Sequence, residues 1–126
     1  MYKVELEKPN FENNYFMITI YLDIDDVTKR HYVETMLLLM KRHGFIRKIY
    51  KRKSSSRKGL HYMIEFKLPK SLWLMKEYHA MLLRYVLHDD IQRIQNDLIR
   101  QRLDLPIDVV FKVKNKKKAQ EWREIK

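Results

Sequence analysis

Two nine-residue segments of the chain carry an apolar or aromatic side chain at every second position, and they limit its fold more than any other feature. They are MITIYLDID at residues 17–25 and LHYMIEFKL at residues 60–68. Successive side chains of a β-strand point to opposite faces, so this alternation predicts two strands with one buried face each. The predicted buried residues are Ile18, Ile20, Leu22 and Ile24 in the first segment, and Leu60, Tyr62, Ile64, Phe66 and Leu68 in the second.

The residues between these two strands predict a helix and a hairpin. Residues 27–43 carry apolar side chains at helical spacing, after Asp25 and Asp26 as capping residues and before Gly44 as the end of the helix. The next apolar segment, residues 45–50, predicts a strand that forms a hairpin with the second alternating segment.

The region after this hairpin predicts further helix. A first helix is expected over residues 71–87, followed by a second over about 90–103 or by one continuous bent helix. Asp89 and Gln92 form a capping-box pattern at the junction. The expected buried stripe of the first helix consists of Leu72, Met75, His79, Leu82 and Val86.

The C-terminal part completes the order of elements. Residues 107–113 predict a last strand, and AQEWREIK at residues 119–126 predicts a short helix. The resulting βαββαβ order, with a helix or a helix pair in the second helical region, is typical of a ferredoxin-like sandwich. In this α+β fold an antiparallel sheet carries helices on one face. We expect a single domain over residues 1–126 with the other sheet face open.

The composition excludes several classes of site. The chain has 126 residues and no cysteine, which excludes disulfides and thiolate metal sites. Its apolar runs are too short to span a bilayer, and the first residues lack the apolar segment of a signal peptide, so we expect a cytoplasmic protein without a membrane partner. The sequence also lacks a glycine-rich phosphate loop, a paired-histidine motif and Ser-His-Asp spacing. We therefore expect no cofactor, no metal and no catalytic residue.

Positive charge is concentrated in two short segments. The formal net charge is +11, from 27 basic and 16 acidic residues. Residues 47–58 contain seven basic residues and no acid, and residues 112–126 contain seven basic residues and two acids, which leaves 13 basic and 14 acidic residues elsewhere. Charge concentrated in this way produces a local field that attracts polyanions.

These segments predict a nucleic-acid-binding surface made of a basic hairpin tip, residues 47–58, and a basic tail, residues 114–126. The arginines of the hairpin suit base edges, the lysines of the tail suit phosphates, and the serines at 54–56 indicate a flexible polar turn. Alternatively, the cations only protect a sheet edge and keep the protein in solution. The predicted contacts are Arg47, Lys48, Lys51, Arg52, Lys53, Arg57, Lys58, Lys112, Lys114, Lys116, Lys117 and Lys118.

Residues 20–25 and 58–66 resemble the two signature strands of RNA-recognition-motif domains, which stack bases on aromatic side chains of the open sheet face. Tyr21 matches an exposed stacking position, and His61 lies on the same expected face. The sequence departs from that family because the aromatic residues of its second segment share the face expected to be buried. The resemblance implies a nucleic-acid partner. For a DNA or RNA partner, the expected stacking residues are Tyr21, His61 or Trp122.

Two further resemblances imply a nuclease. His61 and Tyr78 are similar in placement to the metal-site histidine and the nucleophilic tyrosine of rolling-circle replication initiators and relaxases, although the second histidine of that site is missing. Asp23 resembles an aspartate of the CRISPR-associated Cas2 proteins, which are ferredoxin-like dimers. With Asp25 and Asp26 it offers the oxygen ligands that Mg²⁺ prefers, although helix capping is the simpler role for these two. A degenerate metal-dependent nuclease is therefore one alternative function.

A structural role is the other alternative. The expected open face carries the apolar residues Met63 and Val110, which a second copy would cover, so we expect a homodimer. Such a dimer could serve as an interaction module with no nucleic-acid role. The compact, cysteine-free composition resembles that of small orphan proteins of archaeal viruses and plasmids. Taken together, the sequence favours a non-enzymatic nucleic-acid-binding protein.

Overall fold

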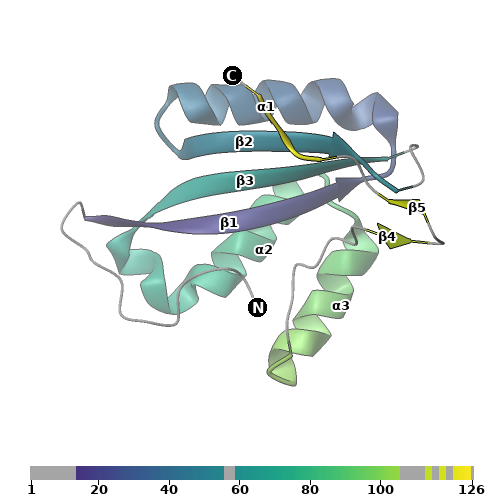
Figure 1. Ribbon diagram of the computed structural model, residues 1–126. Coiled ribbons are helices and arrows are strands. Elements are labelled where there is room, and N and C mark those ends of the chain that lie inside the picture. The colour runs from purple at the N-terminus through teal and green to yellow at the C-terminus, as the bar shows by residue number, and fades with distance from the viewer. Residues whose placement is uncertain (1–13, 56–58, 106–112, 115–116, 119–120, 126) are drawn as a thin grey trace.

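The computed structural model describes residues 14–55, 59–105, 113–114, 117–118 and 121–125 (Figure 1). None of the helices in these ranges is both long and apolar enough to cross a membrane. In chain order the elements are β1 (Tyr15–Ile24), the 3₁₀ helix η1 (Val27–Lys29), α1 (Arg30–Arg42), β2 (Ile46–Lys53), β3 (Leu60–Pro69), the 3₁₀ helix η2 (Lys70–Met75), α2 (Lys76–Val86), α3 (Ile91–Arg102), β4 (Val113–Lys114), β5 (Lys117–Lys118) and β6 (Arg123–Ile125).

One four-stranded sheet organises the molecule. Its strand order is β1-β3-β2-β6, and all neighbouring strands run antiparallel. Helices α1 and α2 cover one face of this sheet, which confirms the predicted α+β class (Figure 1). The described order is not the ferredoxin-like one, because the fourth strand lies beside β2, whereas a ferredoxin-like sheet places its last strand beside the first.

The C-terminal elements differ from the prediction. Most of the strand predicted at 107–113 lies outside the described residues, and its last residue, Val113, belongs to β4, which pairs with β5 in a separate two-stranded sheet. The short helix predicted at 119–126 is wrong over its described part, because residues 123–125 form β6 against β2. Ladder pairing and the packing of Ile125 against the core outweigh local helix propensity here.

The core lies between the sheet and its two covering helices. Ile20 pairs with Ile64, which pairs with Ile49, so the alternation of three strands builds one apolar layer that Val33 and Leu37 of α1 cover. Burying a side chain of this size contributes about 1.5–3 kcal/mol. All nine strand residues predicted to be buried are buried: Ile18, Ile20, Leu22, Ile24, Leu60, Tyr62, Ile64, Phe66 and Leu68.

A β-bulge explains why β2 alternates less clearly than its neighbours. The register against β3 shifts between Ile46 and Lys48. Residues three apart on a regular strand face opposite sides, but the extra residue at the bulge lets Ile46 and Ile49 both reach the core. Arg47 lies at the bulge and is exposed.

The end of α1 follows the predicted signal, but its start does not, because the N-cap residue Lys29 makes no side-chain capping hydrogen bond. Of the two predicted capping residues, Asp26 instead caps η1, which leads into α1. Its Oδ1 accepts hydrogen bonds from Thr28 N at 3.0 Å and from Thr28 Oγ1 at 2.6 Å. After α1, Gly44 has a φ of +85°, a conformation that glycine adopts without a steric penalty.

The stripe predicted to be buried on the helix after Pro69 is wrong. Leu82 and Val86 are 57% and 40% exposed, and α2 buries Ala80 and Met81 instead. The cause is local, because residues 70–75 form a 3₁₀ helix before α2 begins. A 3₁₀ helix has about 3.0 residues per turn rather than 3.6, so the phase extrapolated from residue 71 does not hold along α2.

The second helical region contains two separate helices. His88 has a φ of +61° and ends the first of them. Asp90 caps α3, since its Oδ1 accepts a hydrogen bond from Gln92 N at 2.9 Å. The predicted cap at Asp89 is therefore one residue too early, and Asp89 is buried in another role.

Candidate functional site

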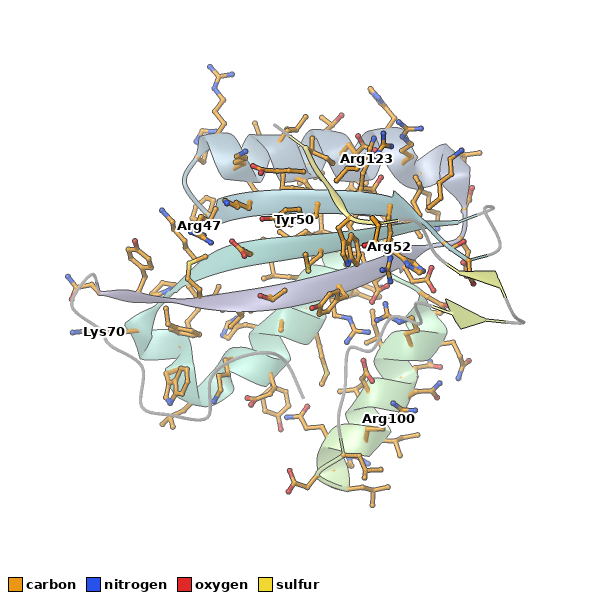
Figure 2. The ribbon with its side chains drawn as sticks, viewed as in Figure 1. Arg47, Tyr50, Arg52, Lys70, Arg100 and Arg123 are labelled. Carbon is orange, nitrogen blue, oxygen red and sulfur yellow. The ribbon has the colours of Figure 1, made fainter. Side chains whose placement is uncertain are left out.

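The structure brings the two basic segments of the sequence together. β6 belongs to the basic tail and β2 to the basic hairpin, and Arg123 pairs with Lys51 across the two strands. Arg52 and Arg123 mark these neighbouring strands in Figure 2. We call the edge formed by residues 47–53 and 123–125 the basic edge. Charges that are far apart in the sequence therefore add to one electrostatic potential around the basic edge.

Two of the hairpin residues predicted to contact nucleic acid, Arg47 and Lys51, form ion pairs with glutamates. Arg47 Nε donates to Glu65 Oε1 at 2.8 Å. Lys51 Nζ donates to Glu34 Oε1 at 3.4 Å, and Glu34 also accepts a hydrogen bond from the buried Tyr62 hydroxyl. These partners reduce the charge that Arg47 and Lys51 offer to a ligand.

The other basic residues predicted to contact nucleic acid fall into three groups, according to how much of each the structure describes. Lys48, Lys53 and Arg123 form no ion pair with any described residue, and Lys53 and Arg123 are exposed. The backbones of Lys114, Lys117 and Lys118 lie in the short strands β4 and β5, and their side chains are outside the description. Four predicted contacts lie outside the described residues altogether: Arg57, Lys58, Lys112 and Lys116.

Arg52, predicted to contact bases, is buried beneath Trp122 on the sheet face opposite the helices. Only 5% of Arg52 is exposed, and its guanidinium carbon lies 4.1 Å from the centroid of the Trp122 ring. The rings of Tyr21 and His61 lie 6.3 Å and 6.5 Å from the same Trp122 ring, between centroids. We call Tyr21, Arg52, His61 and Trp122 the Trp122 cluster. It gathers the three predicted stacking residues at one place.

The cluster contains a cation that forms no ion pair with any carboxylate of the described residues. Arg52 Nε donates to His61 Nδ1 at 3.1 Å, and no described carboxylate forms an ion pair with Arg52. Burial lowers the pKa of Arg52, while attraction from Glu121 opposes that shift. Burial and then the charge of Arg52 lower the pKa of His61 to about 4. His61 is therefore neutral near pH 7, with its proton on Nε2.

A row of partly exposed side chains continues from this cluster. Tyr21 pairs with Met63, Met63 with Tyr50, and Tyr50 with Glu124, so the row crosses all four strands. Alternation correctly placed Tyr21 and Met63 on this face. Sequence reasoning missed Tyr50, because the bulge hides the register of β2.

The base of the hairpin turn is packed rather than open. Ser54 and Ser55 are buried, Ser54 N donates to Gly59 O at 2.9 Å, and Gly59 N donates to Ser54 Oγ at 3.1 Å. A Cβ atom on Gly59 would lie 3.1 Å from Asp25 Oδ1, so glycine permits this close approach to the end of β1. The expectation of a flexible serine turn is wrong for Ser54 and Ser55.

A group of carboxylates lies where β1 ends beside the start of α3. Oxygen atoms of Asp23, Asp25 and Asp90 all lie within 4.8 Å of one another, in a cleft of about 560 Å³. Burial, and then the charge of Asp25, raise the pKa of Asp23 to about 7. These are the described residues that could hold a divalent cation. They replace the predicted set, in which Asp26 stood where the structure has Asp90.

The nuclease arrangement suggested by His61 and Tyr78 is not formed. His61 lies on the open face, where its Nε2 is 3.7 Å from Asp23 Oδ1. Tyr78 is an exposed residue of α2, which covers the other face. The sheet therefore separates the two side chains.

Sequence reasoning also missed a buried ionic network between α2 and α3. Arg84 Nε donates to Asp89 Oδ2 at 2.7 Å and Arg84 Nη1 to Asp97 Oδ2 at 2.6 Å, while Arg93 Nη1 donates to Asp89 Oδ1 at 2.6 Å. We call these four residues the Arg84 network. It reaches β1 because Asp23 N also donates to Asp89 Oδ1, at 2.7 Å. The sequence signal for this network is the alternation of charge at a spacing of four residues, in Asp89, Arg93 and Asp97, which is typical of ion pairs along a helix.

Comparison of the chain with protein-family models, with curated proteins and with solved structures finds no match. The features that bear on function are therefore those of the chain itself. They are the basic edge and the Trp122 cluster beside it.

Proposed function

We propose that the protein binds nucleic acid by contacting backbone phosphates along the basic edge. The observation that supports this best is the pairing of β6 with β2, which joins two segments that together carry fourteen of the 27 basic residues. Basic residues concentrated on neighbouring strands attract a polyanion, and nucleic acid presents closely spaced phosphates.

The contacts of individual cations refine the proposal. Lys48, Lys53 and Arg123 have no described ion-pair partner, so their charge is available to phosphates. Arg47 and Lys51 already have carboxylate partners and contribute less. Binding by point charges of this kind depends on the backbone and discriminates little between base sequences.

Titration of binding with salt tests the proposal. Affinities for single- and double-stranded DNA and RNA should fall steeply with salt, with a log-log slope of about −5 to −6 on duplex DNA if six phosphates are contacted. The absence of binding to every one of these nucleic acids at low salt would contradict the proposal.

A triple variant tests where the contacts lie. Replacing Lys48, Lys53 and Arg123 by alanine should reduce the magnitude of the slope by about 3, or one for each lost phosphate contact.

The matched control removes three exposed cations from other parts of the chain. Arg42 ends α1, Lys70 begins η2 and Arg102 ends α3, and alanine at these positions lowers the net charge equally. The control should keep the wild-type slope. Equal losses in both triple variants would show that net charge alone, and not the basic edge, determines binding.

We also propose that the sheet is that of a ferredoxin-like sandwich. β3 lies between β1 and β2, as in that fold, and the outer edge of β1 has no strand partner within the described ranges. Amide hydrogen exchange should then be slow for the β1 amides on that outer edge, whereas fast exchange of these amides would contradict the assignment.

A further inference from the structure

We propose that Glu121 and Trp122 occupy, in the free protein, the place that a nucleotide of a single strand takes on binding. The inference rests on the proposed function, and it adds the class of nucleic acid and a means of regulation. It starts from the stack of Trp122 on Arg52, where the ring centroid and the guanidinium carbon are 4.1 Å apart.

The position of the Trp122 ring is one that suits a base. Nucleobases stack on guanidinium planes and on aromatic side chains in the same way as an indole does. Below the ring lies Arg52, and beside it lie the rings of Tyr21 and His61. The indole is a fused two-ring system, as a purine is.

Glu121 supplies the other half of a nucleotide's chemistry. The Glu121 carboxylate attracts the Arg52 guanidinium, and Glu121 directly precedes Trp122 in the chain. Aromatic ring and anion thus come from consecutive residues, as base and phosphate come from one nucleotide. A bound strand can replace both interactions, and a phosphate in contact with Arg52 would give this buried cation a closer partner than any described carboxylate does.

Within the described residues, the strand that follows Glu121 and Trp122 is short. β6 has three residues, and its described pairing to β2 begins at Arg123, after Trp122. Trp122 itself remains partly exposed. Displacing it breaks the cation–π stack on Arg52 and the ring contacts with Tyr21 and His61, and it leaves the core layer of the sheet in place.

The geometry selects single strands over duplexes. A base can enter the stack only if it is unpaired, because duplex bases are already stacked on their neighbours. Tyr50 and Met63 continue the face beyond Tyr21, so a second base can stack next to the first.

The variant Trp122→Ala tests the exchange. Its affinity for a labelled single strand, oligo(dT) or oligo(U), should be about 3- to 30-fold higher than that of the wild type at equal salt, because the competing stack is gone. Affinity for a duplex of the same length should not change. Trp73→Phe is the matched control, since Lys76 Nζ lies 4.0 Å from the Trp73 ring centroid in a similar contact away from the basic edge. This variant should bind like the wild type.

Weaker or unchanged single-strand binding by Trp122→Ala would overturn the inference, because Trp122 would then be a binding residue or a bystander. The proposed function fails separately, if the wild type binds no nucleic acid at low salt.

Fluorescence gives a second readout that leaves Trp122 in place. In Trp73→Phe, Trp122 is the sole tryptophan. A saturating single strand should make its emission more accessible to iodide as the indole leaves the stack, and a duplex should not. Emission that becomes less accessible to iodide, or stays unchanged at saturation, would overturn the exchange.

Discussion

Arg84 and Arg52 are both buried, but their charges are balanced in opposite ways. Arg84 is fully buried and donates to the carboxylates of Asp89 and Asp97 at 2.7 Å and 2.6 Å. Arg52, which is 5% exposed, donates to a neutral imidazole and stacks on an indole. The first arginine has its counter-ions within the fold, whereas the second forms no ion pair with any described carboxylate.

This difference separates a structural arginine from one suited to a ligand. The Arg84 network fixes α2, α3 and the end of β1 to one another through hydrogen-bonded charges. The cations of this network already face carboxylates. Arg52 is buried without an ion pair to any described carboxylate, so a phosphate in contact with it would supply a counter-charge.

The largest effect expected from this comparison is on stability. Arg84→Met removes the Arg84 cation from the buried carboxylates of Asp89 and Asp97, of which Asp89 keeps Arg93, and should lower the free energy of unfolding by about 3–5 kcal/mol. Arg52→Met removes a cation–π stack and a hydrogen bond to a neutral group, and it should cost only about 1–2 kcal/mol. Urea denaturation of the two variants against the wild type measures both values.

An exposed arginine provides the control for this pair. Arg102→Met, at the end of α3, should stay within about 0.5 kcal/mol of the wild type. If Arg52→Met proved as costly as Arg84→Met, Arg52 would be a structural residue, and its assignment to ligand binding would be wrong.

The sequence predicted the part of the fold that depends on alternation. The nine apolar residues of β1 and β3 recur at a period of two, and burial of one face follows from strand geometry alone. It could not predict the face that α2 buries, because a 3₁₀ helix of six residues precedes that helix. The choice between α and 3₁₀ after Pro69 depends on packing against the sheet, which is not a local property.

The sequence predicted most residues of the candidate site but not how they are arranged in space. Charge counting identified both basic segments, and the expectation of a nucleic-acid partner made Tyr21, His61 and Trp122 candidate stacking residues. Their meeting depends on the pairing of three residues of β6 with β2, and local pattern favoured a helix there. The burial of Arg52 follows from the same pairing, since Trp122 directly precedes β6.

Asp23 lies between the two arginine sites, and its titration gives the smaller expected effect. Its backbone N–H donates to Asp89 of the Arg84 network, and its Oδ1 lies 3.7 Å from His61 of the Trp122 cluster. Burial and then Asp25 raise the pKa of Asp23 from 3.8 to about 7. A carboxyl group with a raised pKa binds protons more strongly in the folded state, so its contribution to stability is present below pH 3.8 and is lost as the pH rises to about 7.

Asp23→Asn removes this titration and should stabilise the protein more as the pH rises. Relative to the wild type, the gain should be small near about pH 4 and reach on the order of 1–2 kcal/mol near about pH 8, a value reduced by solvent screening. Asp104→Asn, an exposed acid whose left-handed φ of 54° asparagine also accepts, should show no such trend. His61 titrates in the opposite sense, because its pKa is lowered and the fold is destabilised as the pH falls below 6.5. This contribution is common to the wild type and the variant, so it cancels in the difference between their stabilities. If the Asn variant were instead the less stable protein at high pH, the ionised carboxylate of Asp23 would be a favourable partner within the Trp122 cluster, and Arg52 would have a counter-charge in the fold after all.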